Sequence, residues 1–386
     1  MSVITKISRK FRSLQNSYIT YNSVYISRQA ILHNYDMFAA MPANQYVIPV
    51  LKANAYGHGL EQLVSILRDR SMPYVAVDGY FEAIRIHEIS DQPVLVMGAI
   101  DPRNFARIKT KHCAFVVHDT STLEALAVTG KKIRVHLELD TGMHRHGVAH
   151  DEIDDFLKTL KKYPKLELEG VMTHLADADN PRSITFTTQQ AKLFDAVIEK
   201  ILTRGYTPKY LHVAQTAGST KVQSKYANTA RIGIGLYGVN PLEKHDDSCQ
   251  ILDGLQPALT LNSTISKVID LKKGDTVSYG RTFVAPKNMQ IAVLPLGYYE
   301  AIPRTLSNVG VVQVRGTYAP IVGRVCMNHT MIDITDSSAQ TGDAVVIFSS
   351  NTKDRNSIQS ISRQHKLFSY ELLVGISSAV RRTIVD

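Results

Sequence analysis

The sequence predicts an α/β barrel followed by a mostly β domain. At 386 residues, the chain exceeds one ordinary domain, and its 44% of apolar residues can build a sizeable core. From residue 46 to about residue 236, short apolar runs alternate with segments of helical spacing. Beyond about residue 245, strand-like runs of alternating polarity dominate. We therefore expect an α/β domain first and a β-rich domain second.

The first region contains eight strand candidates. They are YVIPVLK (46–52), PYVAVD (73–78), PVLVMG (93–98), AFVVHD (114–119), IRVHLELD (133–140), LEGVMTHL (168–175), YLHVA (210–214) and RIGIGLYG (231–238). Continuous apolar runs are typical of parallel strands that are covered by helices. Eight such units close naturally into a (β/α)8 TIM barrel, and an open doubly wound sheet is the alternative.

Helical segments lie between several of these strands. The clearest are GLEQLVSILRDR (59–70), STLEALAVTG (121–130), EIDDFLKTLKKY (152–163) and QQAKLFDAVIEKIL (189–202). In the last segment, Leu193, Val197, Ile198 and Ile201 fall on one helical face. This pattern predicts amphipathic helices on the outside of the sheet.

The polar stretch EKHDDSCQ (243–250) reads as a domain boundary. We expect a barrel domain over 18–245, whose first strand joins the second domain, and a β-rich domain over 246–386. The strand candidates of the second domain are ALTLNSTISKVIDL (258–271), DTVSYG (275–280), MQIAVLPLG (289–297), NVGVVQV (308–314), YAPIVGRVCM (318–327), TMIDIT (330–335) and DAVVIFS (343–349). Residues 1–17 are expected to form a flexible basic extension.

Charge and cysteine content indicate which kinds of partner, metal site and compartment to expect. The formal charge is +9, but lysines and arginines are spread along the chain, which argues against a nucleic-acid partner. No apolar run is long enough to cross a membrane. Three scattered cysteines predict no metal site and a reducing, cytoplasmic compartment. The start MSVITKISRKFRS is either a solvated tail or a transit peptide, so organelle targeting stays open.

Lys52 ends the first strand candidate. In a TIM barrel, the active site lies at the carboxyl ends of the strands. A lysine there can offer an amine that attacks a carbonyl group. It can equally be a surface lysine whose stem lies along apolar surface. Position alone leaves both interpretations open.

The motif VLKANAYGHG (50–59) resembles the pyridoxal-phosphate lysine motif of alanine racemases. The resemblance covers the chain from about residue 20 to its end. The further motifs are ELDTGMHRHGV (138–148), GVMTHLADAD (170–179), RIGIGLYGVNP (231–241), VSYGRTF (277–283), LPLGY (294–298), VGRVCMN (322–328) and SYELLVGIS (369–377). The resemblance implies a TIM barrel with a β-rich second domain, in a homodimer whose partner completes each site. It also implies D-alanine production for cell wall precursors.

The resemblance assigns two catalytic residues. Lys52 would hold pyridoxal 5'-phosphate as an internal aldimine and transfer a proton on one face of the substrate. Tyr279 would transfer a proton on the opposite face. A second group is needed because one base that retraces its own path would regenerate the same enantiomer.

The resemblance also assigns supporting roles. Arg231 would face the pyridine nitrogen, and His174 would link Arg231 to Tyr279 through hydrogen bonds. Arg145 would pair with the substrate carboxylate. The other implied cofactor contacts are Tyr56, Thr216, Gly233, Ile234 and Tyr370. The other implied substrate and entrance residues are Met327, Glu138, Asp179, Tyr298, Arg304, Arg324 and Asn328.

The match breaks at three places. Glu138 stands where the family usually has a lysine, which is often carbamylated, so we expect activity that does not depend on bicarbonate. Asn328 replaces the aspartate of the family's CMD, and GYYEA replaces GYADG, with Tyr299 and Glu300 near the entrance. These changes leave substrate preference open. The alternatives are a serine or broad-specificity racemase, a non-catalytic pyridoxal-phosphate carrier, and a decarboxylase of the same two-domain plan.

Overall fold

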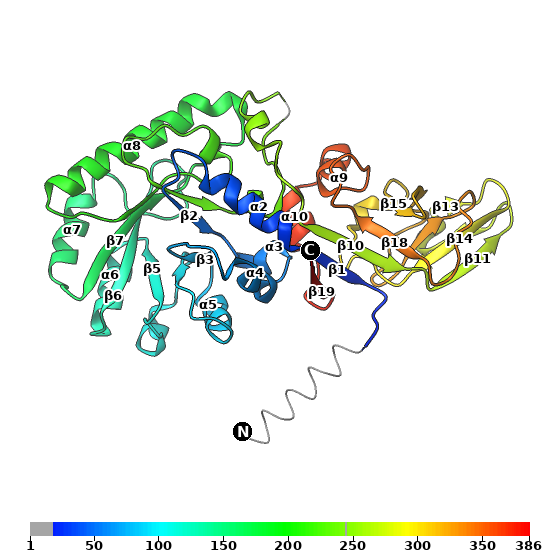
Figure 1. Cartoon of the computed structure of the whole chain (residues 1–386), viewed down its shortest axis with the longest axis horizontal. Helices are drawn as coiled ribbons and strands as arrows, with labels where there is room; N and C mark the ends of the chain where they lie inside the picture. Colours follow the sequence, from blue (N-terminus) through cyan, green and yellow to red (C-terminus); the bar gives the residue numbers. More distant parts are fainter. Residues whose placement is uncertain (1–17, 244) are drawn as a thin grey trace, which may run out of the picture. The chain divides into compact units, whose positions relative to one another are not determined.

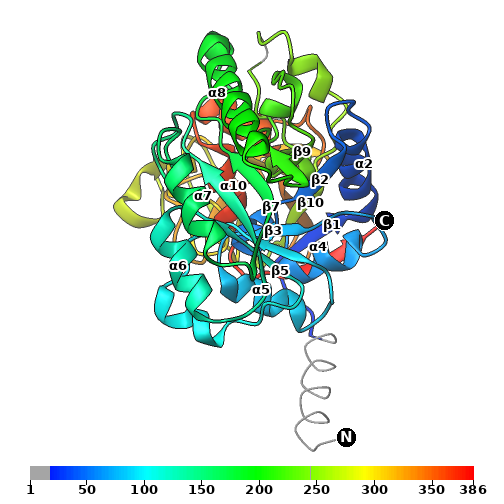
Figure 2. The ribbon, with the colours of Figure 1, turned by 90° about the vertical axis from the view of Figure 1, so that its left-hand side faces the viewer.

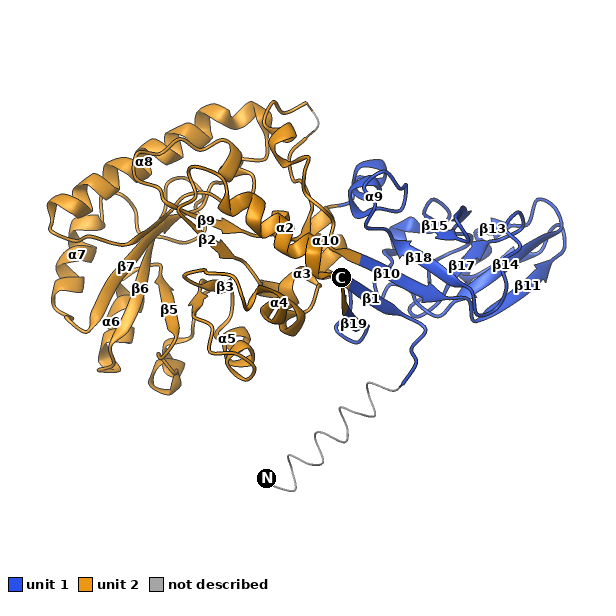
Figure 3. Ribbon diagram, in the orientation of Figure 1, with its two compact units in different colours: residues 1–25, 260–367, 375–383 blue, residues 26–259, 368–374, 384–386 orange. Residues whose placement is uncertain are grey.

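The computed structural model describes residues 18–243 and 245–386. The chain divides into two compact units (Figure 3). Unit 1 comprises the described residues up to Tyr25, together with Thr260–Leu367 and Gly375–Thr383; unit 2 comprises Ile26–Leu259, Phe368–Val374 and Ile384–Asp386. Residues 246–259, which the sequence analysis assigned to the second domain, belong to unit 2. The basic extension expected over residues 1–17 lies outside the described residues.

Unit 2 contains an eight-stranded parallel barrel (Figure 1). Its strands are β2 (Tyr46–Pro49), β3 (Val75–Val77), β4 (Val94–Val96), β5 (Cys113–Val117), β6 (Ile133–Leu139), β7 (Leu166–Thr173), β8 (Tyr210–His212) and β9 (Thr229–Ile232). They neighbour each other in the order β2-β9-β8-β7-β6-β5-β4-β3. A parallel bridge between Val50 and Ala76 joins the two ends. The predicted barrel is therefore confirmed, and the open sheet is excluded.

Amphipathic helices surround these strands (Figure 2). They are α2 (Arg28–Ala39), α4 (Leu60–Leu67), α5 (Tyr80–His87), α6 (Thr120–Val128), α7 (Ile153–Lys161) and α8 (Ile184–Thr203). In α8, Val197, Ile198 and Ile201 are buried and Leu193 is half-buried, as the helical spacing predicts. Among the described residues, no helix combines the length and apolar character that a membrane span requires.

Short helices complete unit 2. They are α3 (Lys52–Tyr56), α10 (Ser369–Val374) and the 3-10 helices η1 (Pro102–Arg107), η2 (Pro181–Ser183), η3 (Gly218–Thr220), η4 (Ile234–Tyr237) and η5 (Cys249–Leu252). The segment RIGIGLYG differs from expectation, because β9 stops at Ile232 and η4 begins two residues later. Gly233 between them has φ −95° and ψ −103°, which breaks the extended conformation.

Unit 1 is mostly β, as predicted. A six-stranded sheet has the order β16-β15-β18-β10-β1-β19, and sheets of three (β11-β14-β17) and two (β12-β13) strands accompany it. The strands are β1 (Ser23–Ser27), β10 (Leu259–Thr264), β11 (Lys267–Leu271), β12 (Thr276–Val277), β13 (Phe283–Val284), β14 (Met289–Leu294), β15 (Val311–Val314), β16 (Thr317–Pro320), β17 (Thr330–Asp333), β18 (Ala344–Phe348) and β19 (Arg381–Val385). Its helical segments are η6 (Tyr279–Arg281), η7 (Arg304–Leu306) and α9 (Ile358–His365).

Candidate active site

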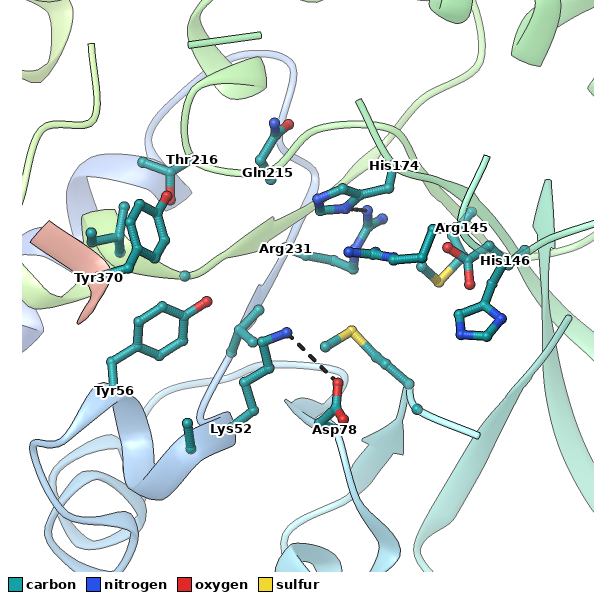
Figure 4. A pocket seen from close by; sticks show the side chains of 18 of the residues that line it. Lys52, Tyr56, Asp78, Arg145, His146, His174, Gln215, Thr216, Arg231 and Tyr370 are labelled. Carbon is teal, nitrogen blue, oxygen red and sulfur yellow. Dashed lines mark hydrogen bonds and ion pairs between the residues drawn. The ribbon is translucent and has the colours of Figure 1, made fainter. Parts of the chain in front are cut away.

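A cavity of about 470 Å³ lies at the carboxyl ends of the barrel strands. Parallel strands bring the residues that follow them to one rim, so segments far apart in sequence meet there. Its lining includes Lys52 after β2, Asp78 after β3, His118 after β5, Arg145 after β6, His174 after β7, Thr216 after β8 and Gly233 after β9. Figure 4 shows Tyr56, Tyr370 and Thr216 on one side of the pocket and Arg145 and His146 on the other.

Lys52 stands at the start of an unusual turn. Its Nζ lies 3.6 Å from Oδ1 of Asp78, and its side chain is 39% exposed (Figure 4). The next four residues, 53–56, have φ between 50° and 54°, which is the left-handed region. Gly57 then ends the turn at φ 79°, where a residue without Cβ carries no steric penalty. The chain therefore leaves strand β2 and reverses within a few residues, with Lys52 in the cavity wall.

Arg231 is a buried charge held by backbone oxygens. Its guanidinium donates to the carbonyl of Thr173 at 2.7 Å and to that of His212 at 3.3 Å. It also lies 3.3 Å from Nδ1 of His174 (Figure 4). Burial lowers the pKa of Arg231 to about 10, so the group stays charged at neutral pH.

His174 is neutral beside this arginine. Burial, then the charges of Arg231 and Arg145, lower the pKa of His174 to about 3. Because Arg231 can only donate, Nδ1 of His174 accepts and the ring proton sits on Nε2. His174 thus offers a donor on its other edge, and the predicted contact between Arg231 and His174 is present.

Glu138 supplies a buried negative charge to the wall of the cavity. Its Oε2 lies 2.7 Å from Nδ1 of His118, although the ring N–H is not aligned for a good hydrogen bond. Burial pushes the pKa of Glu138 up, but His118 and the charges of Arg231 and Arg145 hold it below its usual range. Among the described residues, His118 is the basic side chain within 4 Å of the Glu138 carboxylate, and Arg145 acts on it at longer range.

Hydroxyl and backbone groups form a cradle on the other side of the cavity. A Cβ on Gly233 would lie 2.6 Å from the Tyr56 hydroxyl, so this position leaves no room for a side chain. The Tyr56 ring packs 6.0 Å from that of Tyr370, and burial, with a smaller effect of Asp78, raises the pKa of Tyr56 to about 12. Its hydroxyl therefore keeps its proton and can donate. With the Thr216 hydroxyl and the amides that open η4, the cradle suits a phosphate.

Except for Asp179, the remaining predicted residues belong to unit 1. Tyr279 opens η6, and its side chain is 72% exposed. The Oγ of the preceding Ser278 donates to the Arg324 carbonyl at 2.6 Å. The amide of Tyr298 donates to the Cys326 carbonyl, next to Met327, at 3.0 Å. The segments that carry Tyr279, Arg324, Met327 and Tyr298 are therefore joined by hydrogen bonds.

Comparison with known proteins decides the family. Residues 26–241 match the family described as alanine racemase, N-terminal domain, and residues 258–384 match alanine racemase, C-terminal domain. The chain belongs to the alanine racemase family. An alanine racemase of Geobacter sp. (strain M21) is 34% identical over 372 residues, covering 93% of this chain and 97% of that protein. Alanine racemase 2 of Caldanaerobacter subterraneus subsp. tengcongensis is 32% identical, covering 94% of each chain.

Solved alanine racemases share the whole fold. The structure of the Bacillus anthracis alanine racemase with bound L-Ala-P has a TM-score of 0.87 and 28% sequence identity, covering 96% of each chain. The alanine racemase of E. faecalis has a TM-score of 0.85 and 26% identity, covering 96% of this chain and 99% of that one. Both units of this alanine racemase family member are therefore represented in these relatives.

Two of the departures from the family pattern meet in one contact. The Nδ2 of Asn328 donates to Oε1 of Glu300 at 2.7 Å. The other oxygen of Glu300 accepts from the amide of Gly297 at 2.7 Å. A neutral amide at position 328 can donate to this carboxylate, whereas a second carboxylate would repel it. The two changes are thus compatible with each other in this chain.

The structure also revises the list of predicted residues. Asp179 lines a second cavity, with Asp177, Arg182 and Glu243, and Arg304 opens η7 in unit 1. The sequence analysis missed Asp78, His118, His146 and Gln215 as lining residues of the main cavity. Asp78 and His118 end two predicted strands, so the barrel rule could have found them.

Proposed function

We propose that the protein is a pyridoxal-phosphate-dependent alanine racemase that works as a homodimer. The supporting observation is one cavity that holds Lys52, a cradle of hydroxyl and backbone groups, and a buried arginine. The names of the relatives support alanine as the substrate, and no observation favours a serine racemase, a carrier or a decarboxylase.

The cavity fits pyridoxal 5'-phosphate. Gly233 leaves the space beside the Tyr56 hydroxyl that a Cβ would fill, and Thr216, Ile234 and Tyr370 line the same side. These groups would hold the phosphate, Lys52 would hold the cofactor covalently, and Arg231 would face its ring nitrogen. When bound, pyridoxal phosphate delocalises the electrons left at Cα after proton removal. An arginine cannot take up a proton, so Arg231 would act there only as a donor.

Lys52 would move the Cα proton on one face of the substrate. Its Nζ opens into the cavity, and Asp78 at 3.6 Å gives the ammonium form a counter-charge. Arg145 lines the same cavity and points towards Arg231 and His174 in Figure 4. It would bind the substrate carboxylate, which orients Cα towards Lys52.

Tyr279 of the partner subunit would move the proton on the other face. On its own chain, Tyr279 is 72% exposed, and Tyr299 and Met327 are also more than half exposed. Exposed aromatic and apolar side chains of this kind are typical of surfaces that bind another chain. The neutral His174, with its proton on Nε2, would donate to the phenolic oxygen and favour its deprotonated form. The Met327 amide of the partner subunit would support the substrate carboxylate.

We propose that the enzyme supplies D-alanine for cell wall precursors in the cytoplasm. The free cysteines Cys113, Cys249 and Cys326 suit a reducing compartment.

The test combines a racemisation assay with a cofactor spectrum. Purified protein with pyridoxal phosphate should convert L-alanine to D-alanine, followed by polarimetry, faster than it converts other L-amino acids. Lys52→Ala should lose both the activity and the visible absorbance of the lysine-bound cofactor. A protein that binds the cofactor but never exchanges the Cα proton for deuterium would be a carrier. Faster turnover of serine would redirect the proposal to a serine racemase, and release of CO₂ to a decarboxylase.

A further inference from the structure

The turn that carries Lys52 is held in an unfavourable backbone conformation. Ala53, Asn54, Ala55 and Tyr56 all have positive φ, although each has a Cβ. L-residues enter the left-handed region as isolated residues, because Cβ then crowds the carbonyl oxygen. Four in succession persist only where neighbouring groups stabilise the conformation. The direction of the Lys52 side chain depends on this turn, since Lys52 immediately precedes it.

A side chain of α5, Glu82, binds the backbone of this turn. Oε1 of Glu82 accepts from the amide of Ala53 at 2.7 Å. Oε2 of the same carboxylate accepts from the amide of Asp78 at 3.1 Å and from that of Gly79 at 3.2 Å. Glu82 lies in the first turn of α5 and is half-buried. A single carboxylate therefore bridges the segment after β2 and the segment after β3.

The bridged segments carry two groups that meet in the cavity. The first contains Lys52 and the second contains Asp78, whose Oδ1 is 3.6 Å from Nζ of Lys52. The bridge between Val50 and Ala76 and the bond from the Leu51 amide to the Ala76 carbonyl already join the ends of β2 and β3. Glu82 adds a side-chain link between the segments that follow them, which carry the amine and its counter-charge. The Oδ1 atom of Asn54 caps the amide of Leu60 at 3.0 Å and ties the far end of the turn to α4.

We propose that Glu82 is a positioning residue for Lys52. It holds the left-handed turn in place so that the lysine amine points into the cavity beside Asp78. This role concerns the direction of the Lys52 side chain. Its importance for catalysis rests on the function proposed for Lys52. The bridge itself is a structural claim that can be tested without any turnover.

The chemistry of the bridge requires a carboxylate. Both oxygens of an ionised glutamate are acceptors, and together they take three backbone N–H groups here. A glutamine of the same shape has one acceptor oxygen and one donor NH2 group. Glu82→Gln would therefore leave either Ala53 or the Asp78–Gly79 pair facing a donor. The variant changes the bridge with almost no change in volume.

Glu82 could instead serve only to cap α5. Its bond to the Gly79 amide is one half of a capping box at the start of that helix. Glu82→Asp separates the two roles, because it keeps a negative charge in the first turn of α5 but is shorter by one methylene group. We expect the aspartate to stabilise α5 and to fail to reach Ala53.

The experiment measures hydrogen exchange of the cofactor-loaded protein, together with the visible circular dichroism of its cofactor. In Glu82→Gln and Glu82→Asp, the peptide that contains Ala53 should exchange about tenfold faster than in the unchanged protein. The dichroic band should weaken in both variants because the lysine is less fixed. The peptide that covers α7 should keep its exchange rate. Glu88→Gln, at the other end of α5 on an exposed residue, is the matched control and should change neither signal.

Two results would overturn the proposal. Unchanged exchange of the Ala53 peptide in both variants would mean that Glu82 does not hold the turn. Faster exchange confined to α5 would mean that Glu82 is only a helix cap. If the unchanged protein shows no absorbance band of a lysine-bound cofactor, the proposed function is wrong. The exchange rates would still show whether Glu82 holds the turn.

Discussion

At the scale of single residues, the charges around the cavity are fixed by their neighbours. Arg231 stays charged because backbone carbonyls and Glu138 compensate it, and His174 stays neutral because it is buried and two arginines lie near it. Glu138 is ionised without any added group and pairs with His118. A permanent carboxylate thus occupies the position where the family usually has a modified lysine.

The first prediction concerns this carboxylate. Activity of the unchanged protein should not respond to bicarbonate, because Glu138 already carries the charge that carbamylation gives a lysine. Glu138→Lys should lower activity at least about tenfold in CO₂-free buffer, since it places a cation among two arginines. Added bicarbonate should restore part of that loss. A bicarbonate-dependent rise in the rate of the unchanged protein would contradict this interpretation.

The second prediction concerns His174 and pH. Its pKa in the folded state is about 3, whereas an unfolded histidine titrates near about 6.5. Below about pH 6.5, the unfolded chain therefore binds a proton that the folded chain does not, so this histidine makes the folded state lose stability as pH falls. The loss should be up to about 1 kcal/mol per pH unit between about pH 6.5 and pH 5.

Urea unfolding at several pH values measures this effect. His174→Gln cannot take up the proton, so its free energy of unfolding should fall less steeply with decreasing pH. Parallel curves for the two proteins would show that His174 is protonated in the folded state.

At the scale of elements, the short connections after the strands make the site. The third prediction tests one of them. Gly233→Ala places a methyl group 2.6 Å from the position of the Tyr56 hydroxyl and so fills the cradle. The dissociation constant of pyridoxal phosphate should rise at least about tenfold in fluorescence titrations.

A matched alanine substitution controls for effects of glycine itself. At Gly254, a new Cβ would meet only the flexible end of Met37, at 3.1 Å. Gly254→Ala should leave the affinity for the cofactor unchanged. Equal affinities of both variants and the unchanged protein would show that Gly233 is not part of a phosphate site.

The sequence predicted the regular elements well because their pattern is local. Seven of the eight barrel strands and the helices α4, α6, α7 and α8 follow from apolar runs and helical spacing, while β9 shares only two residues with its predicted run. Lys52, His174 and Arg231, which the family motifs assign to the site, line one cavity, and their roles there stay predictions.

The features of the site that the sequence did not predict depend on contacts between segments far apart in the chain. Nothing in ANAY (53–56) signals four left-handed residues, since alanine favours ordinary helix. The bridge from Glu82 to Ala53 spans 29 positions, and the contact of Asn328 with Glu300 spans 28. Such pairings follow from the folded backbone and have no signature in a single sequence.

At the scale of the whole molecule, the predicted catalytic pair is divided between two units. Lys52 belongs to the barrel of unit 2, and Tyr279 belongs to the β-rich unit 1, where it is exposed. In a symmetric dimer, each site would take Lys52 from one subunit and the phenol from the other. We expect sedimentation to give a dimer, with Tyr279 inaccessible to modification in the assembled enzyme.

The most direct test is to combine two inactive variants in one dimer. Lys52→Ala and Tyr279→Phe, carried on separately tagged chains, should each be inactive as homodimers. The purified mixed dimer should regain about half of the alanine racemase activity of the unchanged enzyme, because one of its two sites keeps both an intact Lys52 and the partner's Tyr279. A mixed dimer with no more activity than its parents would contradict a site shared between subunits and the two-base account built on it.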